Sequence, residues 1–479
     1  MLINKHRLNS YKNIAKDSME LRNIRRNANV EIRKLKKDTC LMKRRNIDSN
    51  DKDNAGISLN EILANMNSSD VTMMITVARD VRKMLSLDIN PPIDVVIKNG
   101  IVPKLIEFLQ IDNIELQFEA AWSITNVASG TSQQTQYLTS LGVIPILVKL
   151  LHSTSTSVIE QTVWALGNIA GDSAEFRNVV IQNGVIPIFI ELLRTKSSDS
   201  LCKNLTWALS NMCRNKNPGP PFEVFVQLAP VFAQLLHSPV KEVAVDSCWA
   251  LSYISDGDEA QVQLVINTNV LPILMRLLNL TELRSLPPIL RTIGNILTGN
   301  EAQTQHVIDA GALNHFHKLL SHGNADLVKE ACWALSNIAA GSRSQIQELF
   351  NHDLVVKIIE VLSQGEYKCK REAAWCIANL TSGGEVGQTL KVVHLGALQP
   401  LCDLLCVNDL TTMKIVLDTI RNILVAARHV DQIEPVTDMI EECGGLDSLE
   451  KLQLCESHQI YQMAFSIIET FFKSDESTN

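Results

Sequence analysis

Apolar residues recur along the chain at the spacing of an α-helix. In and just before the segment QTVWALGNIAGD, Ile159, Val163, Leu166 and Ala170 fall on one stripe of a helical wheel with about 100° per residue. Such a stripe indicates a helix that packs one face into a core. Similar segments follow one another through most of the chain, so the pattern predicts an all-α protein.

The apolar segments are copies of one repeat. They read FEAAWSITNVASG, QTVWALGNIAGD, NLTWALSNMCRN, DSCWALSYISDG, ILRTIGNILTGN, EACWALSNIAAG and REAAWCIANLTSG, at steps of 42 or 43 residues. All six tryptophans of the chain lie at one position of this frame, which is occupied by Trp122, Trp164, Trp207, Trp249, Arg291, Trp333 and Trp375. A fixed period of this size is typical of α-solenoids.

A second column of residues runs in phase with the tryptophans. Most of its members are Gly or Asn, which tolerate the left-handed backbone at which a helix ends and the chain turns. We expect each period to hold a short helix, a turn and two longer helices, as in an armadillo or HEAT solenoid. The column comprises Gly100, Gly142, Gly184, Asn269, Gly311, Asp353 and Gly396.

The repeat frame also sets the expected domain limits. It extends to a degenerate repeat at Arg79 and Lys83 and to another at Asp418 and Asn422, which gives about ten repeats with a period of 42 residues. We expect a basic segment at 1–50, a linker at 51–70, repeats 1 to 9 at 71–433, a capping repeat at 434–472 and a disordered tail at 473–479.

The tryptophans, and the asparagines four residues after most of them, are expected to be exposed. Trp164, Asn168 and Gln161 fall roughly opposite the apolar stripe, which a core tryptophan would share. Residues at i and i+4 are neighbours on a helix surface, so stacked repeats align these pairs into a ladder. A row of exposed aromatic side chains marks an interaction site.

The ladder has the chemistry to bind an extended basic peptide. An asparagine amide has a donor and an acceptor, which match the N–H and C=O of a peptide backbone. Slots between tryptophan rings suit a long side chain that ends in a cation. Acidic residues beside the ladder would complete these slots, namely Asp172, Asp246, Glu330 and Glu372.

Charge is divided between a basic tail and an acidic body. Residues 1–45 contain 14 Lys or Arg and four Asp or Glu, whereas the rest of the chain contains 30 and 48. Because the nearest acidic partner of the tail is the body itself, we expect the two to associate.

Composition and motifs exclude several classes of protein. No apolar run approaches the 18 or so residues that cross a bilayer, and the first 20 residues lack the apolar core of a secretory signal. The eleven cysteines include no CxxC pair and are expected to be buried thiols. No GxxxxGK[ST], HExxH or GxSxG motif is present, so we expect no enzyme activity, cofactor, metal site or membrane partner.

The sequence resembles the importin alpha family of nuclear import adaptors over essentially its whole length. Matching stretches are QFEAAWSITNVASGTSQQTQ, VWALGNIAGD, LTWALSNMCRNKNPGPP, IGNILTG and IEECGGLDSLEKLQ. The tail RLNSYKNIAKDSMELRNIRRNANVEIRKLKKDTCLMKRRNI resembles the family's importin-beta-binding segment. The resemblance implies an armadillo-repeat adaptor that binds nuclear localisation signals of cargo and links them to importin-beta.

The resemblance also implies two peptide sites, with Tyr253 and Arg291 interrupting the ladder between them. A monopartite signal would use the major site and a bipartite signal both. The major site would comprise Trp122, Asn126, Gly130, Thr135, Gln161, Trp164, Asn168, Asp172, Trp207, Asn211 and Trp249. The minor site would comprise Asn295, Thr304, Glu330, Trp333, Asn337, Glu372, Trp375 and Asn379.

The resemblance implies further partners. A recycling exportin with Ran-GTP would contact the capping repeat, nucleoporins would be additional partners, and the protein would shuttle between cytoplasm and nucleus. The tail is expected to inhibit the protein, because Lys43, Arg44 and Arg45 form a run like the signals it would compete with. Tethering gives such a run an effective concentration around millimolar. Importin-beta would withdraw it from the groove.

Two other functions stay open from the residues alone. A catenin-like armadillo scaffold in adhesion or signalling shares the solenoid but would use a basic groove for acidic partners. The tail could also neutralise nucleic-acid phosphates. The acidic body would repel such a polymer, so we expect no direct nucleic-acid partner.

Overall fold

The computed structural model describes residues 43–44, 59–87, 90–195, 198–214, 217–279 and 285–472. These residues form helices and connecting turns, and no β-strand occurs among them. They divide into two compact units, the first ending at Gly257 and the second beginning at Asp258. The all-α fold predicted from the hydrophobic pattern is confirmed.

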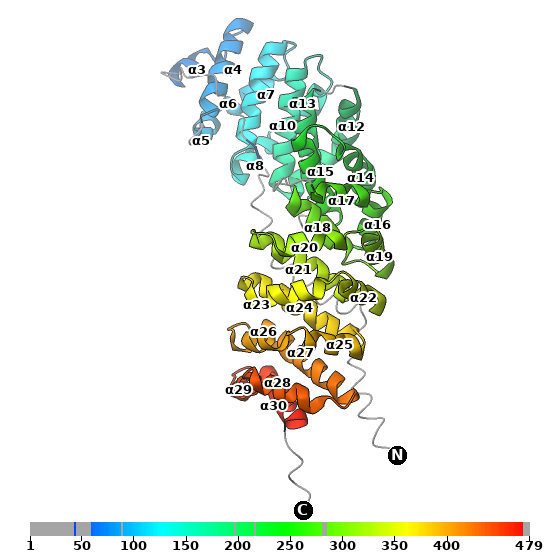
Figure 1. Ribbon diagram of the computed structural model, residues 1–479. Helices are drawn as coiled ribbons and strands as arrows, with labels where there is room; N and C mark the ends of the chain where they lie inside the picture. Colours follow the sequence, from blue (N-terminus) through cyan, green and yellow to red (C-terminus); the bar gives the residue numbers. More distant parts are fainter. Residues whose placement is uncertain are drawn as a thin grey trace, which may run out of the picture. The chain divides into compact units, whose positions relative to one another are not determined.

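The first unit is a stack of repeats whose long helices lie side by side. Helices α4, α7, α10, α13 and α15 each pack against the next one along the chain (Figure 1). The helices of this unit are α3 (Leu59–Asn65), α4 (Val71–Leu85), α5 (Ile93–Lys98), α6 (Ile101–Phe108), α7 (Ile114–Ala128), α8 (Ser132–Ser140), α9 (Val143–Leu150), α10 (Thr156–Asp172), α11 (Ala174–Gln182), α12 (Val185–Thr195), α13 (Asp199–Met212), α14 (Phe222–Leu235) and α15 (Lys241–Ile254).

The second unit repeats the same arrangement. Its long helices α18, α21, α24, α27 and α30 pack in series. Its helices are α16 (Glu259–Asn267), α17 (Leu271–Asn279), α18 (Leu286–Ile296), α19 (Glu301–Asp309), α20 (Leu313–Leu320), α21 (Ala325–Ala339), α22 (Arg343–Asn351), α23 (Leu354–Gln364), α24 (Tyr367–Gly383), α25 (Val386–His394), α26 (Leu398–Asp403), the 3-10 helix η3 (Leu404–Cys406), α27 (Leu410–His429), α28 (Ile433–Glu442), α29 (Gly445–Leu452) and α30 (His458–Phe471).

The predicted left-handed column is confirmed at every position. Gly142 has φ of 72°, and even the two members with a side chain, Asn269 and Asp353, have φ of 57° and 51°. The remaining members are also left-handed, with φ of 68° at Gly100, 75° at Gly184, 78° at Gly311 and 87° at Gly396. These residues reverse the chain between the two short helices of a repeat, because a helix cannot continue through this conformation.

The helix lengths differ from the expectation of one short and two longer helices. In the repeat that ends with α10, α8 has nine residues, α9 has eight and α10 has 17. The second helix is short because the polar run after Leu151 ends it and places Ser155 at the start of α10. Each such repeat therefore holds two short helices and one long one. In the repeat that lacks a column residue, one helix, α14, replaces the short pair.

Polar contacts join neighbouring segments of the first unit. Arg177 of α11 has no exposed surface, and its guanidinium donates to the carbonyl oxygens of Arg214 and Pro218, both at 2.7 Å. Burial lowers the pKa of Arg177 to about 10. These bonds hold the connection between α13 and α14 in place. They provide hydrogen-bond donors for two carbonyl groups that lack a partner within a helix.

Parts of the expected domain division lie outside the described residues. These are all of residues 1–50 except Lys43 and Arg44, all of 51–58, and the tail at 473–479. Within the expected linker, Leu59–Asn65 form α3, whose Ile62 is buried, and α3 contacts α4. The domain limits stay predictions.

Within the described ranges, no single helix is both long and apolar enough to cross a membrane. Two pairs of helices with a sharp bend between them pass that test together, α11 with α12 and α16 with α17.

Candidate functional site

The six tryptophans are more buried than the helical wheel indicates. They lie on α7, α10, α13, α15, α21 and α24, in chain order. Trp207 and Trp333 are 2% and 3% exposed, and the other four are half-buried. The expectation of exposed tryptophans is therefore wrong, because each long helix is packed against neighbouring repeats as well as against its own short helices.

The asparagines of the ladder are buried, contrary to expectation, and they join successive long helices. The Nδ2 of Asn168 donates to the carbonyl oxygen of Thr125 at 3.1 Å, and that of Asn211 donates to Gly167 at 3.1 Å. In the second unit Asn337 donates to Gly294 at 3.3 Å and Asn379 to Ser336 at 2.8 Å. The same amide thus crosslinks two repeats, a role that the sequence analysis missed. None of the six is more than 3% exposed: Asn126, Asn168, Asn211, Asn295, Asn337 and Asn379.

Lys43 of the tail inserts its ammonium group among residues of the expected major site. Its Nζ donates to Thr135 Oγ1 at 2.7 Å and to the Gly130 carbonyl at 2.8 Å, and it forms an ion pair with Asp172 Oδ1 at 2.6 Å. An ammonium group has three donors, so these three oxygens satisfy it. Burial lowers the pKa of Lys43 from its ordinary value, and Asp172 opposes this shift.

The backbone of Arg44 is held by one tryptophan–asparagine pair. The Arg44 N–H donates to Asn168 Oδ1 at 2.8 Å. The Arg44 carbonyl accepts from Asn168 Nδ2 at 2.9 Å and from Trp164 Nε1 at 2.8 Å. Because these bonds involve only main-chain groups of the tail, they can hold any residue except proline at this position.

The Arg44 side chain reaches the next two long helices. Its Nη2 lies 3.1 Å from Asp246 Oδ2, and its Cζ lies 4.7 Å from the ring centroid of Trp207. Burial raises the pKa of the Asp246 carboxyl, and Arg44 opposes the shift. An arginine stacked on an aromatic face and paired with a carboxylate is a strong recognition contact. We call the whole set of contacting residues the first groove: Gly130, Thr135, Trp164, Asn168, Asp172, Trp207 and Asp246.

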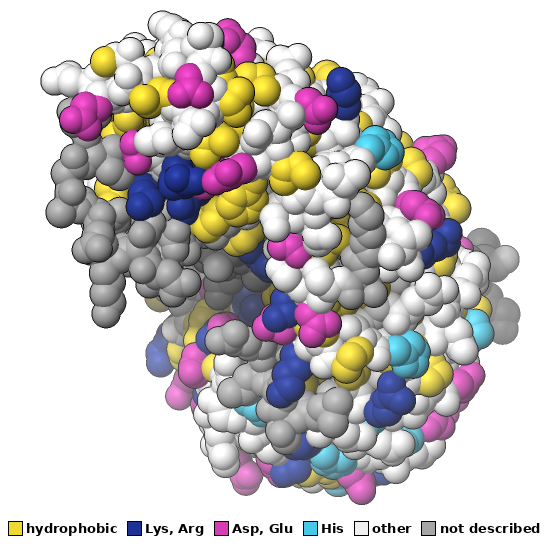
Figure 2. Space-filling model, turned by 90° about the horizontal axis from the view of Figure 1, so that it is seen from above, with side chains coloured by type: hydrophobic (Ala, Val, Ile, Leu, Met, Phe, Trp, Pro, Cys, Tyr) yellow, Lys and Arg dark blue, Asp and Glu magenta, His cyan; other side chains and the backbone are white. Residues whose placement is uncertain are grey.

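An open pocket of about 870 Å³ adjoins Lys43 and Arg44 and is lined also by Asn90, Pro91 and Trp164. Figure 2 shows Lys and Arg side chains close to Asp and Glu side chains over the visible described surface. That face therefore shows no broad field of one charge sign that could guide a ligand on its own.

The remaining residues of the expected major site lie along the same helices. Gln161 is buried on α10, and the Trp249 ring stacks on Tyr253 at 6.0 Å between centroids. Trp122 faces an internal cation, because the Arg82 Cζ lies 4.6 Å from its ring centroid and Arg82 Nε pairs with Glu119 at 2.6 Å. The sequence analysis missed Arg82, although it lies three residues after Arg79 in the repeat frame.

The second unit brings together the residues of the expected minor site. We call Asn295, Thr304, Glu330, Trp333, Asn337, Glu372, Trp375 and Asn379 the second cluster; they lie on α18, α19, α21 and α24. Its acids have basic neighbours in the chain. Glu330 Oε1 lies 3.3 Å from Lys329 and 3.5 Å from Arg291, and Glu372 lies 3.8 Å from Arg371. Arg45, the third residue of the expected inhibitory run, lies outside the described residues.

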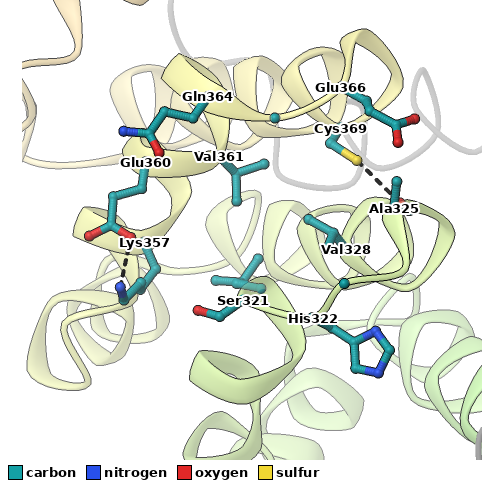
Figure 3. A pocket seen from close by; sticks show the side chains of 13 residues that line it. Ser321, His322, Ala325, Val328, Lys357, Glu360, Val361, Gln364, Glu366 and Cys369 are labelled. Carbon is teal, nitrogen blue, oxygen red and sulfur yellow. Dashed lines mark hydrogen bonds and ion pairs between the residues drawn. The ribbon is translucent and has the colours of Figure 1, made fainter.

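A separate cavity of about 300 Å³ in the second unit is lined from α20, α21, α23 and α24 (Figure 3). Lys357 and Glu360 form an ion pair at 2.6 Å, and Cys369 Sγ donates to the Ala325 carbonyl at 3.2 Å (Figure 3). Its lining residues include no tryptophan or asparagine, so the cavity is distinct from the second cluster.

Three family models match the chain. One described as importin beta binding domain matches residues 7–89, and one described as atypical Arm repeat matches 434–479. An armadillo/beta-catenin-like repeat model matches residues 90–129, 131–171, 173–214 and 300–340.

Similar proteins cover nearly the whole chain. Importin subunit alpha-3 of Caenorhabditis elegans is 50% identical in an alignment of length 479 that covers 98% of this chain and 93% of the relative. Importin subunit alpha-B of Dictyostelium discoideum is 49% identical in an alignment of length 476 that covers 96% of this chain and 92% of the relative. The crystal structure of an engineered protein has a TM-score of 0.78 and 25% identity over 86% of this chain and 98% of its own.

Proposed function

Because the chain belongs to the importin alpha family of nuclear import adaptors, we propose that its first groove binds the lysine- and arginine-rich nuclear localisation signals of cargo. The observation that carries the proposal is the occupation of this groove by Lys43 and Arg44. Proteins of this family are transport adaptors, not enzymes. The importin beta binding domain at residues 7–89 implies binding of importin-beta.

The contacts divide recognition into two parts. Trp164 and Asn168 hold the main chain of Arg44 without regard to its side chain. Asp172 and Asp246 each pair with a cation. The ligand that fits is therefore an extended peptide with two adjacent basic residues. A catenin-like scaffold for acidic partners is not favoured, because both charged side chains of the first groove are carboxylates.

Trp207 supplies a further donor for such a peptide. Its Nε1 is buried and has no acceptor among the described residues. In the preceding repeat the equivalent atom of Trp164 donates to the Arg44 carbonyl at 2.8 Å. A cargo peptide longer than this pair of residues can offer a carbonyl to Trp207, which removes the cost of a buried, unpaired N–H group.

The same contacts support inhibition of the chain by its own tail. Lys43 and Arg44 use the oxygens, the amide and the ring that a cargo signal needs, so tail and cargo exclude each other. Both residues also belong to the segment matched by the importin beta binding domain. Importin-beta that holds this segment therefore withdraws the competitor and opens the first groove to cargo.

The second cluster binds a second basic stretch of a bipartite signal under this proposal. Trp333, Trp375 and the paired asparagines repeat the arrangement of the first unit. Glu330 and Glu372 already face Arg291, Lys329 and Arg371, so a peptide cation must compete with cations of the chain itself. We expect this cluster to contribute less affinity than the first groove.

Recycling and localisation complete the proposal. A recycling exportin with Ran-GTP would bind the last repeat, where Leu454, Tyr461 and Phe465 are exposed. Nucleoporins are proposed as further partners, and the protein would shuttle between cytoplasm and nucleus as its family does.

The test compares cargo binding with and without the tail contacts. A fluorescent lysine- and arginine-rich peptide is titrated, by anisotropy at fixed salt, into the full chain and into the variant with Lys43→Ala, Arg44→Ala and Arg45→Ala. The variant should bind more tightly, and importin-beta should tighten binding only to the unmodified chain. The double variant Lys36→Ala and Lys37→Ala is a control with less basic charge in the same tail, and it should bind the peptide like the unmodified chain.

Two results would contradict the proposal in different ways. Equal affinity of the full chain and the triple variant would exclude inhibition by the tail. If none of these proteins binds the basic peptide, even with importin-beta present, the first groove is excluded as a signal-binding site.

A further inference from the structure

Two glycines of the long helices leave room for the tryptophan of the following repeat. A Cβ atom added at Gly167 would lie 2.6 Å from Cζ3 and 3.1 Å from Cε3 of Trp207. A Cβ atom at Gly294 would lie 2.6 Å from Cε3 of Trp333 and closer still to its Cζ3. Real Cβ atoms essentially never approach so closely, so both indole rings rest directly on the backbone of the preceding long helix.

Each repeat of the ladder has a position equivalent to Gly167 and Gly294, but only these two positions hold a glycine. The position lies three residues after the tryptophan position and is Gly167 before Trp207 and Gly294 before Trp333. These are the two tryptophans that are buried, whereas the other four are half-buried. Before those four, in order from Trp122 to Trp375, the position holds Arg82, Thr125, Ser210 and Ser336.

The residue at this position also shapes what faces the next ring. Arg82 places its guanidinium over Trp122 at 4.6 Å. Gly167 and Gly294 have no side chain to hold the next helix away. This alone sets them apart, because the carbonyls of Thr125 and Ser336 accept an asparagine amide in the same way as theirs do. The long helices can therefore approach each other closely at these two points, and the tryptophan there is buried more deeply than the other tryptophans.

The depth of Trp207 matters because Arg44 lies over it. The Arg44 guanidinium fits between the Trp207 ring, 4.7 Å away, and Asp246, 3.1 Å away. A ring displaced outward by a Cβ at position 167 would enter the space that the guanidinium occupies. Lysine needs less of this space, because its ammonium group is compact and makes no planar stack.

We propose that Gly167 and Gly294 are positioning residues that set the depth of Trp207 and Trp333 and so give each unit one deep slot for an arginine side chain. The inference rests on the proposed function and refines it, since it assigns a preference for arginine over lysine at the peptide position equivalent to Arg44. Asp172, which pairs with the neighbouring lysine, has no part in this preference.

The test measures that preference in the full chain with Lys43→Ala, Arg44→Ala and Arg45→Ala, in which the tail no longer competes. Two fluorescent peptides are used, one with Lys-Arg at the central positions and one with Lys-Lys. Gly167→Ala should weaken binding of the Lys-Arg peptide at least tenfold and that of the Lys-Lys peptide much less. Ser210→Ala, at the same position of the next repeat, is the matched control and should preserve the ratio of the two affinities.

A second measurement separates ring positioning from a general effect on folding. A Cβ atom at Gly167 would also lie 3.0 Å from the Cβ atom of Ala208, a contact that remains in Trp207→Leu. Gly167→Ala should therefore lower the melting temperature much more when Trp207 is present than when Trp207→Leu has removed the benzo ring. This difference can be measured even if Gly167→Ala folds poorly.

The outcomes distinguish the inference from the function on which it rests. Unchanged affinities and an unchanged ratio in Gly167→Ala, with peptide still bound, would refute the inference and leave the proposed function intact. The same shift of melting temperature with and without Trp207→Leu would also refute it. Absence of peptide binding by the parent protein would refute the proposed function itself.

Discussion

Asn168 and the backbone of Arg44 exchange two hydrogen bonds. The Arg44 N–H donates to Asn168 Oδ1 at 2.8 Å, and Asn168 Nδ2 donates to the Arg44 carbonyl at 2.9 Å. The same Nδ2 also donates to Thr125 on the preceding long helix at 3.1 Å. Because one amide joins two repeats and a peptide, recognition and repeat packing depend on the same side chain.

This double role predicts the effect of Asn168→Ala combined with Asn211→Ala. Each lost hydrogen bond contributes about 0.5 to 1.5 kcal/mol, so affinity for a monopartite basic peptide should fall at least tenfold. The free energy of unfolding should also fall, by about 1 to 3 kcal/mol, because two bonds between helices are lost.

The control for this prediction is Asn379→Ala, which removes the equivalent bond to Ser336 in the second unit. It should lower stability while affinity for the monopartite peptide stays constant. Anisotropy gives the affinity and urea denaturation the stability. A double variant that is as stable as the parent would contradict the crosslinking role, and one that binds as tightly would contradict the clamp.

The repeat frame and the turns could be predicted from sequence because they depend on local chemistry. A left-handed residue before a helix favours Gly, Asn or Asp whatever the tertiary context, and all seven column positions have that conformation. Asp172 and Asp246 could also be proposed from the residues, since acids beside the ladder mark slots for cations, whereas Gly130 and Thr135 are expected only from the family resemblance.

The burial of the ladder could not be predicted from one helix at a time. A helical wheel assumes a single packed face, whereas α10 packs against α7 on one side and α13 on the other. The burial of Asn168 and the contact of the Trp207 ring with the backbone at Gly167 both depend on the neighbouring repeat. Such contacts become visible only when the repeats are stacked in register.

Gly142→Ala isolates the cost of the left-handed turn. Gly142 has φ of 72°, and an added Cβ would meet no atom within 4 Å. Any loss of stability therefore comes from the backbone, and we expect about 1 kcal/mol. Gly323→Ala is the control, since its Cβ would also meet no atom and its φ lies outside the left-handed range. A similar cost for both variants, measured by urea denaturation, would contradict the assignment.

The buried thiol of Cys248 is expected to lower the free energy of unfolding at alkaline pH. Burial raises the pKa of its thiol from 9.0 to about 12. As pH rises above 9 the unfolded chain loses this proton first, so stability is present below pH 9 and is lost up to about pH 12. At pH 10 this one thiol should lower the free energy of unfolding by about 1.4 kcal/mol.

The measurement compares unfolding at pH 7 and pH 10 in the parent and in Cys248→Ala. The parent should lose about 1.4 kcal/mol more than the variant between the two values. Val243→Ala, a truncation on the same helix without a titrating group, should show the parent's dependence on pH. Identical dependence in parent and Cys248→Ala would mean that the thiol ionises equally easily in the folded and unfolded chain.

Asp172 offers the sharpest test of competition between tail and cargo. Its Oδ1 pairs with Lys43 at 2.6 Å and accepts from Ser132 Oγ at 3.0 Å. Asp172→Asn keeps the shape and the bond from Ser132 but removes the charge, and a hydrogen bond to a charged group contributes about 1.5 to 3 kcal/mol. In the variant with Lys43→Ala, Arg44→Ala and Arg45→Ala, cargo affinity should therefore fall about tenfold to a hundredfold. Asp172→Lys should abolish binding there, because it places like charge in the slot.

In the full chain the same Asp172→Asn change should have a much smaller effect. The change weakens binding of the tail and binding of the cargo to the first groove by a similar factor, since both place a lysine against Asp172. Because the two compete, these losses of affinity cancel. Anisotropy titrations of one peptide into both backgrounds measure the difference, with Glu330→Gln in the second unit as the charge-matched control. If Asp172→Asn costs the same affinity in both backgrounds, Lys43 does not compete for the first groove, and the tail serves only to bind importin-beta.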